Sequence, residues 1–104
     1  MKDVREITGF MDRAARDSRL GPMHISVYLA ILYCWVQQGR KGPARVKGKE
    51  LMDLAKIGGA TPFYRTLKEL HRYGYIDYKP SFFAGERSWV YLPLVETMGY
   101  RWKG

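Results

Sequence analysis

The sequence predicts a single α+β domain that is mostly helical. Three observations predict it. Two segments with helical apolar periodicity fill the first third of the chain, two shorter helical segments flank a glycine turn, and two aromatic and β-branched segments follow. The length of 104 residues fits one domain, and 46% hydrophobic with 27% charged residues is typical of a folded chain. We expect an N-terminal helical extension over 1–20, a core over 22–92 and a tail over 93–104.

The first two helices are expected before residue 39. The first runs from about Asp3 to Arg16, where Asp3 and Glu6 fit a capping pair. Its apolar stripe is Val4, Ile7, Met11 and Ala14. This stripe must pack either on the core of the domain or on a second copy of the chain. The second helix starts at Pro22 and runs to about Gln38, and it is apolar nearly all round, which is typical of a central helix.

A helix-turn-helix unit is expected next. Residues 44–46 can form a very short strand, and Lys49–Lys56 reads as a short helix with Leu51, Leu54 and Ala55 on one face. Residues 57–60 contain two glycines and break it. A longer helix follows from Thr61 to about Tyr73, with Thr61 as N-cap and Gly74 as terminator. In such units the second helix enters the major groove of DNA.

The Thr61 helix has two different faces at 100° per residue. Apolar positions gather on one side: Phe63, Leu67 and Leu70, with Thr66 adjacent. Basic positions gather on the opposite side: Arg65, Lys68 and Arg72, with Tyr64 and His71 beside them. The pattern suits a recognition helix, whose basic face supplies donors to phosphates and guanine edges. An ordinary amphipathic surface helix has the same pattern, so the helix alone does not decide between the two.

Two strands are expected at the end of the core, Tyr75–Lys79 and Trp89–Leu92. Residues 80–88 would form a long hairpin tip flanked by Lys79 and Arg87. Phe82 and Phe83 within it either pack back on the domain or form an exposed wedge or partner-binding knob.

The charge of the chain favours a polyanionic partner. The net charge is +8 and the pI is about 9.8. Residues 40–104 carry a net charge of +7, which is most of this excess. A basic run without an acid before Glu50 adjoins the helix-turn-helix segment: Arg40, Lys41, Arg45, Lys47 and Lys49. Such a run is either a solvated loop or a set of phosphate contacts.

Several classes of protein are disfavoured. The single cysteine, Cys34, lies in an apolar helical run and excludes an intrachain disulfide. No signal segment is apparent, and the longest apolar stretch, Val27–Val36, is too short for a bilayer, so we expect a cytoplasmic protein without a membrane partner. His24 and His71 are far apart in sequence, and no zinc spacing, phosphate loop or nucleophile elbow is present. We therefore expect neither catalysis nor a metal or other cofactor.

The segment from Ala44 to Leu92 resembles the winged helix-turn-helix family, including MarR-type and GntR-type bacterial regulators. The resemblance rests on residues 49–55, 61–65 and 67–70, leading into Tyr73-Gly74-Tyr75-Ile76. It covers about half the chain, or two-thirds with the Pro22 helix. Residues 10–15 and 20–26 also look like small winged-helix proteins encoded near bacterial mobile elements. One departure is Gly48, at a position where family members often have Ser or Thr.

The resemblance implies a winged helix-turn-helix fold with an extra N-terminal helix and a two-stranded wing. It also implies a transcriptional regulator that binds double-stranded DNA as a homodimer, joined through the N-terminal helix and the C-terminal tail. The expected DNA contacts are Thr61, Tyr64, Arg65, Lys68, Arg72, Lys47, Lys49, Arg45, Lys79 and Arg87. The alternative is a winged-helix interaction or assembly module, or a mobile-element accessory factor in replication or excision.

Overall fold

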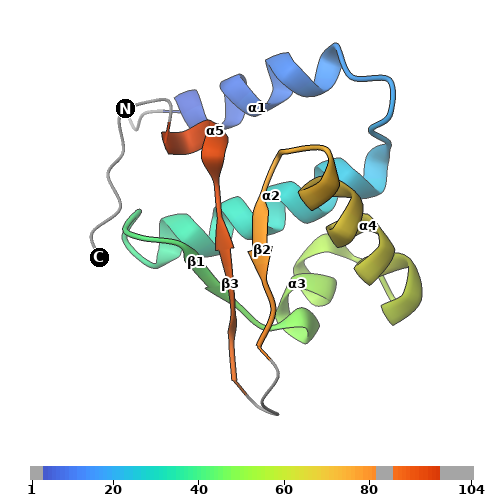
Figure 1. Cartoon of the computed structure of the whole chain (residues 1–104), viewed down its shortest axis with the longest axis vertical. Coiled ribbons are helices and arrows are strands. Elements are labelled where there is room, and N and C mark those ends of the chain that lie inside the picture. The colour runs from blue at the N-terminus through green and yellow to red at the C-terminus, as the bar shows by residue number, and fades with distance from the viewer. Residues whose placement is uncertain (1–3, 82–85, 97–104) are drawn as a thin grey trace.

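A computed structural model describes residues 4–81 and 86–96, and it shows a small α+β domain (Figure 1). The elements in chain order are α1 (Arg5–Ala15), α2 (Pro22–Gln37), β1 (Ala44–Val46), α3 (Gly48–Ala55), α4 (Ala60–Arg72), β2 (Asp77–Lys79), β3 (Ser88–Tyr91) and α5 (Pro93–Glu96). The predicted α+β class is therefore confirmed. The last helix, α5, was not predicted: its Val95 is fully buried, so the expected tail begins as part of the fold.

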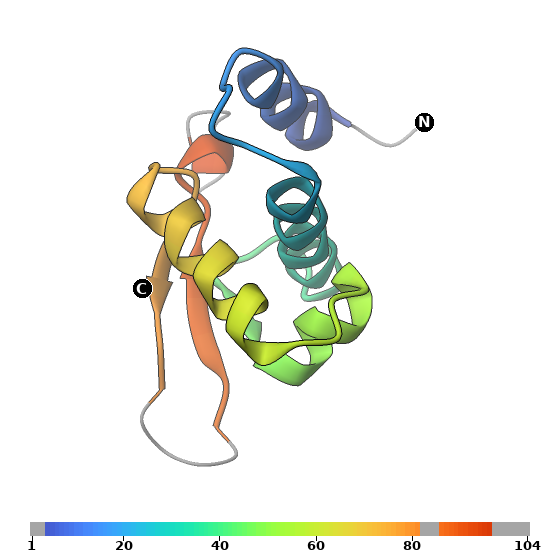
Figure 2. The same cartoon turned by 90° about the vertical axis from the view of Figure 1, so that its right-hand side faces the viewer.

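The three strands form one antiparallel sheet in the order β1-β3-β2. Ala44 pairs with Val90 and Val90 pairs with Tyr78, so the short strand joins the hairpin instead of standing apart from it. The short strand predicted at residues 44–46 is thus confirmed, whereas its pairing with the hairpin was not predicted. The helices lie on one side of the sheet, and α1 packs above α2 at the far end from the hairpin tip (Figures 1 and 2).

Helix α2 is the centre of the core, as its nearly uniform apolar sequence predicted. Tyr28 and Trp35 are fully buried in it, and the Trp35 indole N–H donates to the Gly42 carbonyl at 3.0 Å. Phe10 of α1 stacks on Tyr28 with ring centroids 3.9 Å apart, and Tyr75 meets Phe10 edge-on at 5.8 Å. These aromatic contacts join α1, α2 and the chain leaving α4 into one cluster.

The buried face of α1 differs from the predicted stripe. Of the expected residues only Ala14 is buried; Val4, Ile7 and Met11 are 43%, 45% and 39% exposed. The helix instead buries Glu6, Phe10 and Ala14, which lie four residues apart. Phe10 offers more apolar surface to α2 than the smaller stripe residues, and Glu6 tolerates burial because Arg40 donates to it at 2.9 Å.

Helix α2 begins at Pro22 as predicted, whereas the starts of α1, α3 and α4 differ from the predictions by one or two residues. The N-cap of α4 is Gly59, and Thr61 lies inside the first turn; the N-cap of α3 is Lys47, with Gly48 as its first residue. The N-cap of α1 is Val4, and neither α1, α3 nor α4 has a side-chain cap hydrogen bond. Gly74 does terminate α4, with a φ of 85° that favours glycine.

One predicted core residue is outside the core: Leu54 of α3 is 44% exposed, whereas Leu51 and Ala55 are buried. The predictions for Asp3, Phe82, Phe83 and residues 97–104 lie outside the described residues.

Candidate nucleic-acid interface

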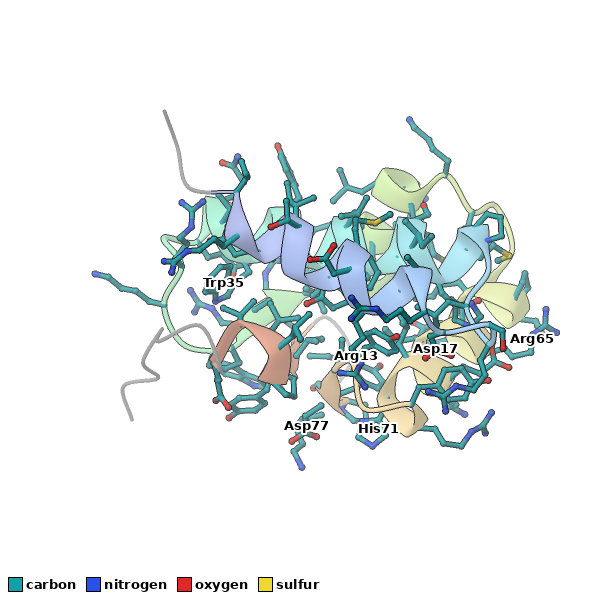
Figure 3. All side chains as sticks on the ribbon, turned by 90° about the horizontal axis from the view of Figure 1, so that it is seen from above. Arg13, Asp17, Trp35, Arg65, His71 and Asp77 are labelled. Carbon is teal, nitrogen blue, oxygen red and sulfur yellow. The ribbon has the colours of Figure 1, made fainter. Side chains whose placement is uncertain are left out.

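The two faces of α4 are arranged as the sequence predicts. Its apolar side is fully or nearly fully buried, by Phe63, Thr66, Leu67 and Leu70. Its other side is exposed and bears Thr61, Tyr64, Arg65, Lys68, His71 and Arg72. Figure 3 shows Arg65 pointing away from the body of the domain. A shallow hollow runs along this side between Ala60 and Arg72. The structure thus presents one basic helical face to solvent.

The inner edge of α4 is held to α2 by a pair that the sequence analysis did not find. The Gly21 N–H donates to Nδ1 of His24 at 2.9 Å. Nδ1 therefore accepts, and the ring proton lies on Nε2, which donates to Glu69 at 2.8 Å. These two bonds fix α4 against the start of α2. The bond to Glu69 joins residues 45 positions apart, so local spacing gave no signal for it.

The C-terminal end of α4 is held to α1 and the turn after it. Arg13 donates to the Tyr73 carbonyl at 3.1 Å, and its guanidinium lies 4.0 Å from the Tyr75 ring centroid. The Tyr75 hydroxyl donates to Asp17 at 2.9 Å, and Arg19 donates to the same carboxylate. The Arg19 hydrogen bonds, opposed by partial burial and aided by Tyr75, hold the pKa of Asp17 well below its usual range. Arg13 and Asp17 lie close together in Figure 3.

The packing of α4 against α3 depends on a glycine at the first residue of α3. A Cβ on Gly48 would overlap the Tyr64 hydroxyl and lie 3.2 Å from Tyr64 Cζ. Gly48 therefore lets Tyr64 of α4 lie over the first turn of α3. In addition, Ser26 donates to the Ala55 carbonyl at 2.6 Å, which ties the end of α3 to α2.

The cations on α4 are available to different degrees. Within 4–81 and 86–96, Arg65 and Lys68 form no ion pair. Arg72 lies 4.0 Å from Glu69, at the limit of an ion pair, with a side chain 68% exposed. His71 accepts from the Tyr78 N–H at 3.0 Å through Nδ1, so it has a hydrogen-bonded surface position. Arg65 and Lys68 are thus the cations of this face most open to a ligand.

Arg87 is engaged by an acid of α3. Its guanidinium donates to both Glu50 carboxylate oxygens, at 2.7 and 3.2 Å, and both side chains are nearly half exposed. These hydrogen bonds lower the pKa of Glu50 and raise that of Arg87. The pair links the chain just before β3 to α3. The predicted phosphate contact of Arg87 would have to compete with Glu50.

The other predicted contacts fall in two places. Lys47 and Lys49 are exposed at the start of α3, where Lys49 lies 3.9 Å from Asp53. Arg45 and Lys79 lie on the outer face of the sheet, away from the helices, and Arg45 faces Trp89. The ten predicted residues therefore divide among the α4 face, the start of α3, the chain just before β3 and the outer sheet face. Trp89 was not among the predicted contacts, and its alternation with buried Val90 was its only signal.

No helix among the described residues is long and apolar enough to cross a membrane. No group of three or more potential metal-ligating His, Cys, Asp or Glu side chains occurs in the same residues. Burial raises the pKa of the Cys34 thiol, which disfavours the thiolate. Comparison with protein-family models, with curated proteins and with solved structures gives no match.

Proposed function

We propose that this chain is a winged helix-turn-helix protein that binds double-stranded DNA and acts as a transcriptional regulator. The observation that supports it most is the α4 face: exposed cations on one side, an apolar anchor on the other, and a glycine-containing turn to α3 before it. The β2–β3 hairpin beside α4 would be the wing. Helix α4 would lie in the major groove.

Individual roles follow from exposure and pairing. Arg65 and Lys68, which carry no ion pair in the described chain, would approach base edges, and Arg72 near the end of α4 would contact the backbone. Lys47 and Lys49 at the start of α3 would contact neighbouring phosphates. Such contacts fix the position of the protein on the duplex without reading sequence.

A second copy of the chain is part of the proposal, because one short helix reads few base pairs. Among the described residues, five of the eight large hydrophobic side chains that are exposed lie on α1, its N-cap or α2. They are Val4, Ile7, Met11, Leu29 and Tyr33. All of these except Met11 line an apolar groove between α1 and α2. Two copies joined here would read half-sites about 34 Å apart.

The experiment is selection of bound sequences from a random duplex pool, followed by affinity measurements on the selected site. Arg65→Ala should cost roughly 1–3 kcal/mol of binding free energy and relax the preference at one position if Arg65 reads a guanine. Arg16→Ala, an exposed arginine of the α1 end, is the matched control. Failure of the pool to enrich any sequence, with no duplex bound at low salt, would leave the interaction-module alternative instead.

The dimer has its own test in sedimentation velocity. Ile7→Glu should shift a dimer toward monomer because it places a charge in the apolar groove. Leu54→Glu, an equally exposed apolar site on α3, should not. A monomeric wild-type protein at the concentration of DNA binding would contradict this part of the proposal.

A further inference from the structure

The outer face of the sheet carries one row of exposed side chains across all three strands. Trp89 of β3 pairs with Arg45 of β1 on one side and with Lys79 of β2 on the other. Residues paired directly across strands point to the same face, so the three side chains stand side by side. The next row, Ala44, Val90 and Tyr78, points to the opposite face, toward the helices, with Ala44 and Val90 fully buried.

The tryptophan in this row is exposed, unlike the tryptophan of α2. Trp89 is 44% exposed, whereas Trp35 is fully buried. The Arg45 guanidinium lies 6.0 Å from the Trp89 ring centroid, at the limit of a cation–π contact. Tyr91 follows on the same face two residues along β3, about 7 Å away at the usual strand rise. Two aromatic rings thus share this face of β3, and the Trp89 ring has a cation on each side.

The charge of the face is positive in its exposed row. Arg45 forms no ion pair with any residue in the described ranges. Lys79 lies 3.5 Å from Asp77, which is on the same face opposite Tyr91, and the Lys79 side chain stays 61% exposed. A ligand that matches this row needs a flat ring for Trp89 and anionic groups on both sides of it. Nucleobases joined by phosphates have that chemistry.

We infer that the outer sheet face binds single-stranded nucleic acid, with a base stacked on Trp89 and backbone phosphates at Arg45 and Lys79. Aromatic rings with flanking cations bind single strands with little sequence preference, because every base has a stacking face. In a duplex the bases stack on one another, so Trp89 distinguishes the two forms. This face is separate from α4, which lies on the helical side of the sheet (Figure 2).

The test uses fluorescence anisotropy of a labelled oligothymidylate of about 12 nucleotides at low salt, within the usual site size of such surfaces. Trp89→Ala should weaken binding by about 5- to 150-fold. Trp89→Phe keeps a ring and should lose less. Leu54→Ala removes an equally exposed apolar side chain of α3 and is the matched control, with no change expected. Circular dichroism of each variant verifies the fold.

A second variant covers the case in which Trp89→Ala unfolds the protein. The double variant Arg45→Ala with Lys79→Ala keeps the Trp89 ring in place. It should weaken oligothymidylate binding and also make the affinity depend less steeply on salt concentration. Oligouridylate in a parallel measurement shows whether the face prefers RNA or DNA. Absence of oligonucleotide binding at low salt would overturn the inference, and so would equal affinity of wild type and Trp89→Ala. Self-association that disappears in Trp89→Ala would also overturn it, because a second copy would then cover the row.

The outcome is distinguishable from that of duplex binding. Arg65→Ala with Lys68→Ala should leave oligothymidylate affinity unchanged, and Trp89→Ala should leave duplex affinity unchanged. Oligothymidylate binding without duplex binding would refute the proposed function and support this inference. Duplex binding without oligothymidylate binding would refute this inference and support the proposed function.

Discussion

Tyr28→Phe is expected to stabilise the protein. The Tyr28 ring is fully buried and stacked on Phe10, yet its hydroxyl has no hydrogen-bond partner in the described chain. Burial raises the pKa of this hydroxyl, in agreement with an apolar surrounding. An unsatisfied buried polar group costs about 1–3 kcal/mol. Removing the oxygen leaves the ring packing intact and a void smaller than a methyl group, so we expect a gain of about 1 kcal/mol.

Tyr75→Phe is the matched comparison in the same aromatic cluster. Tyr75 is also fully buried, but its hydroxyl donates to the Asp17 carboxylate at 2.9 Å. Hydrogen bonds to charged groups contribute about 1.5–3 kcal/mol, and because Arg19 still holds Asp17 in the variant we expect a loss near the low end of that range. One and the same substitution at two buried tyrosines should therefore change stability in opposite directions.

The assay is thermal and urea unfolding of the two variants and the wild type. A change of 1 kcal/mol shifts the melting temperature of a domain of this size by about 4–8 °C. Tyr28→Phe should melt higher and Tyr75→Phe lower, with unchanged urea m-values. Destabilisation by Tyr28→Phe would refute the reasoning, because it would mean that the Tyr28 hydroxyl has a hydrogen-bond partner in solution.

Three further substitutions test the surface. Glu50→Gln should tighten duplex binding and steepen its salt dependence, since Arg87 is released from the pair; an unchanged salt slope would contradict this. Gly48→Ala should displace the Tyr64 ring and weaken duplex binding with little change in melting temperature, and an unmoved ring by NMR would disprove it. Asp17→Asn should make the protein lose less stability in acid than the wild type loses. The pKa of Asp17 is lower in the folded than in the unfolded protein, so its carboxylate stabilises the fold at pH above the unfolded pKa of about 3.9. This stabilisation is lost as the pH falls toward the folded pKa. Unfolding free energies of wild type and Asp17→Asn, measured between pH 2 and 6, test this prediction.

Local patterns predicted the elements whose faces are set by their own residues. The two faces of α4 follow from 3.6-residue periodicity, because Phe63, Leu67 and Leu70 are the only large apolar residues in that helix that share a side. The end of α4 at Gly74 follows from the φ of 85° that this position requires. The central position of α2 follows from its apolar circumference.

Distant contacts decide what the patterns missed. A glutamate at position 6 predicts an exposed side chain. Glu6 is nevertheless buried, because Arg40, 34 positions away, donates a hydrogen bond to it, and α1 can therefore pack with its Glu6 side against the core. The three-stranded sheet forms because β1 pairs with β3, with Ala44 opposite Val90, and no local spacing in the sequence indicates this pairing. The candidate site was predicted for α4, but Arg87 was expected to be open, because its Glu50 partner lies on another element.

The most direct measurement of the central claim is the salt dependence of duplex binding by wild type and by Arg65→Ala with Lys68→Ala. If about six phosphates are neutralised, wild-type affinity should fall on the order of a thousandfold from 50 to 200 mM salt. Each lost phosphate contact reduces the slope by about 0.9, and a lost base contact lowers affinity at all salt concentrations. Equal affinity and equal slope for the two proteins would contradict the claim that the α4 face binds DNA.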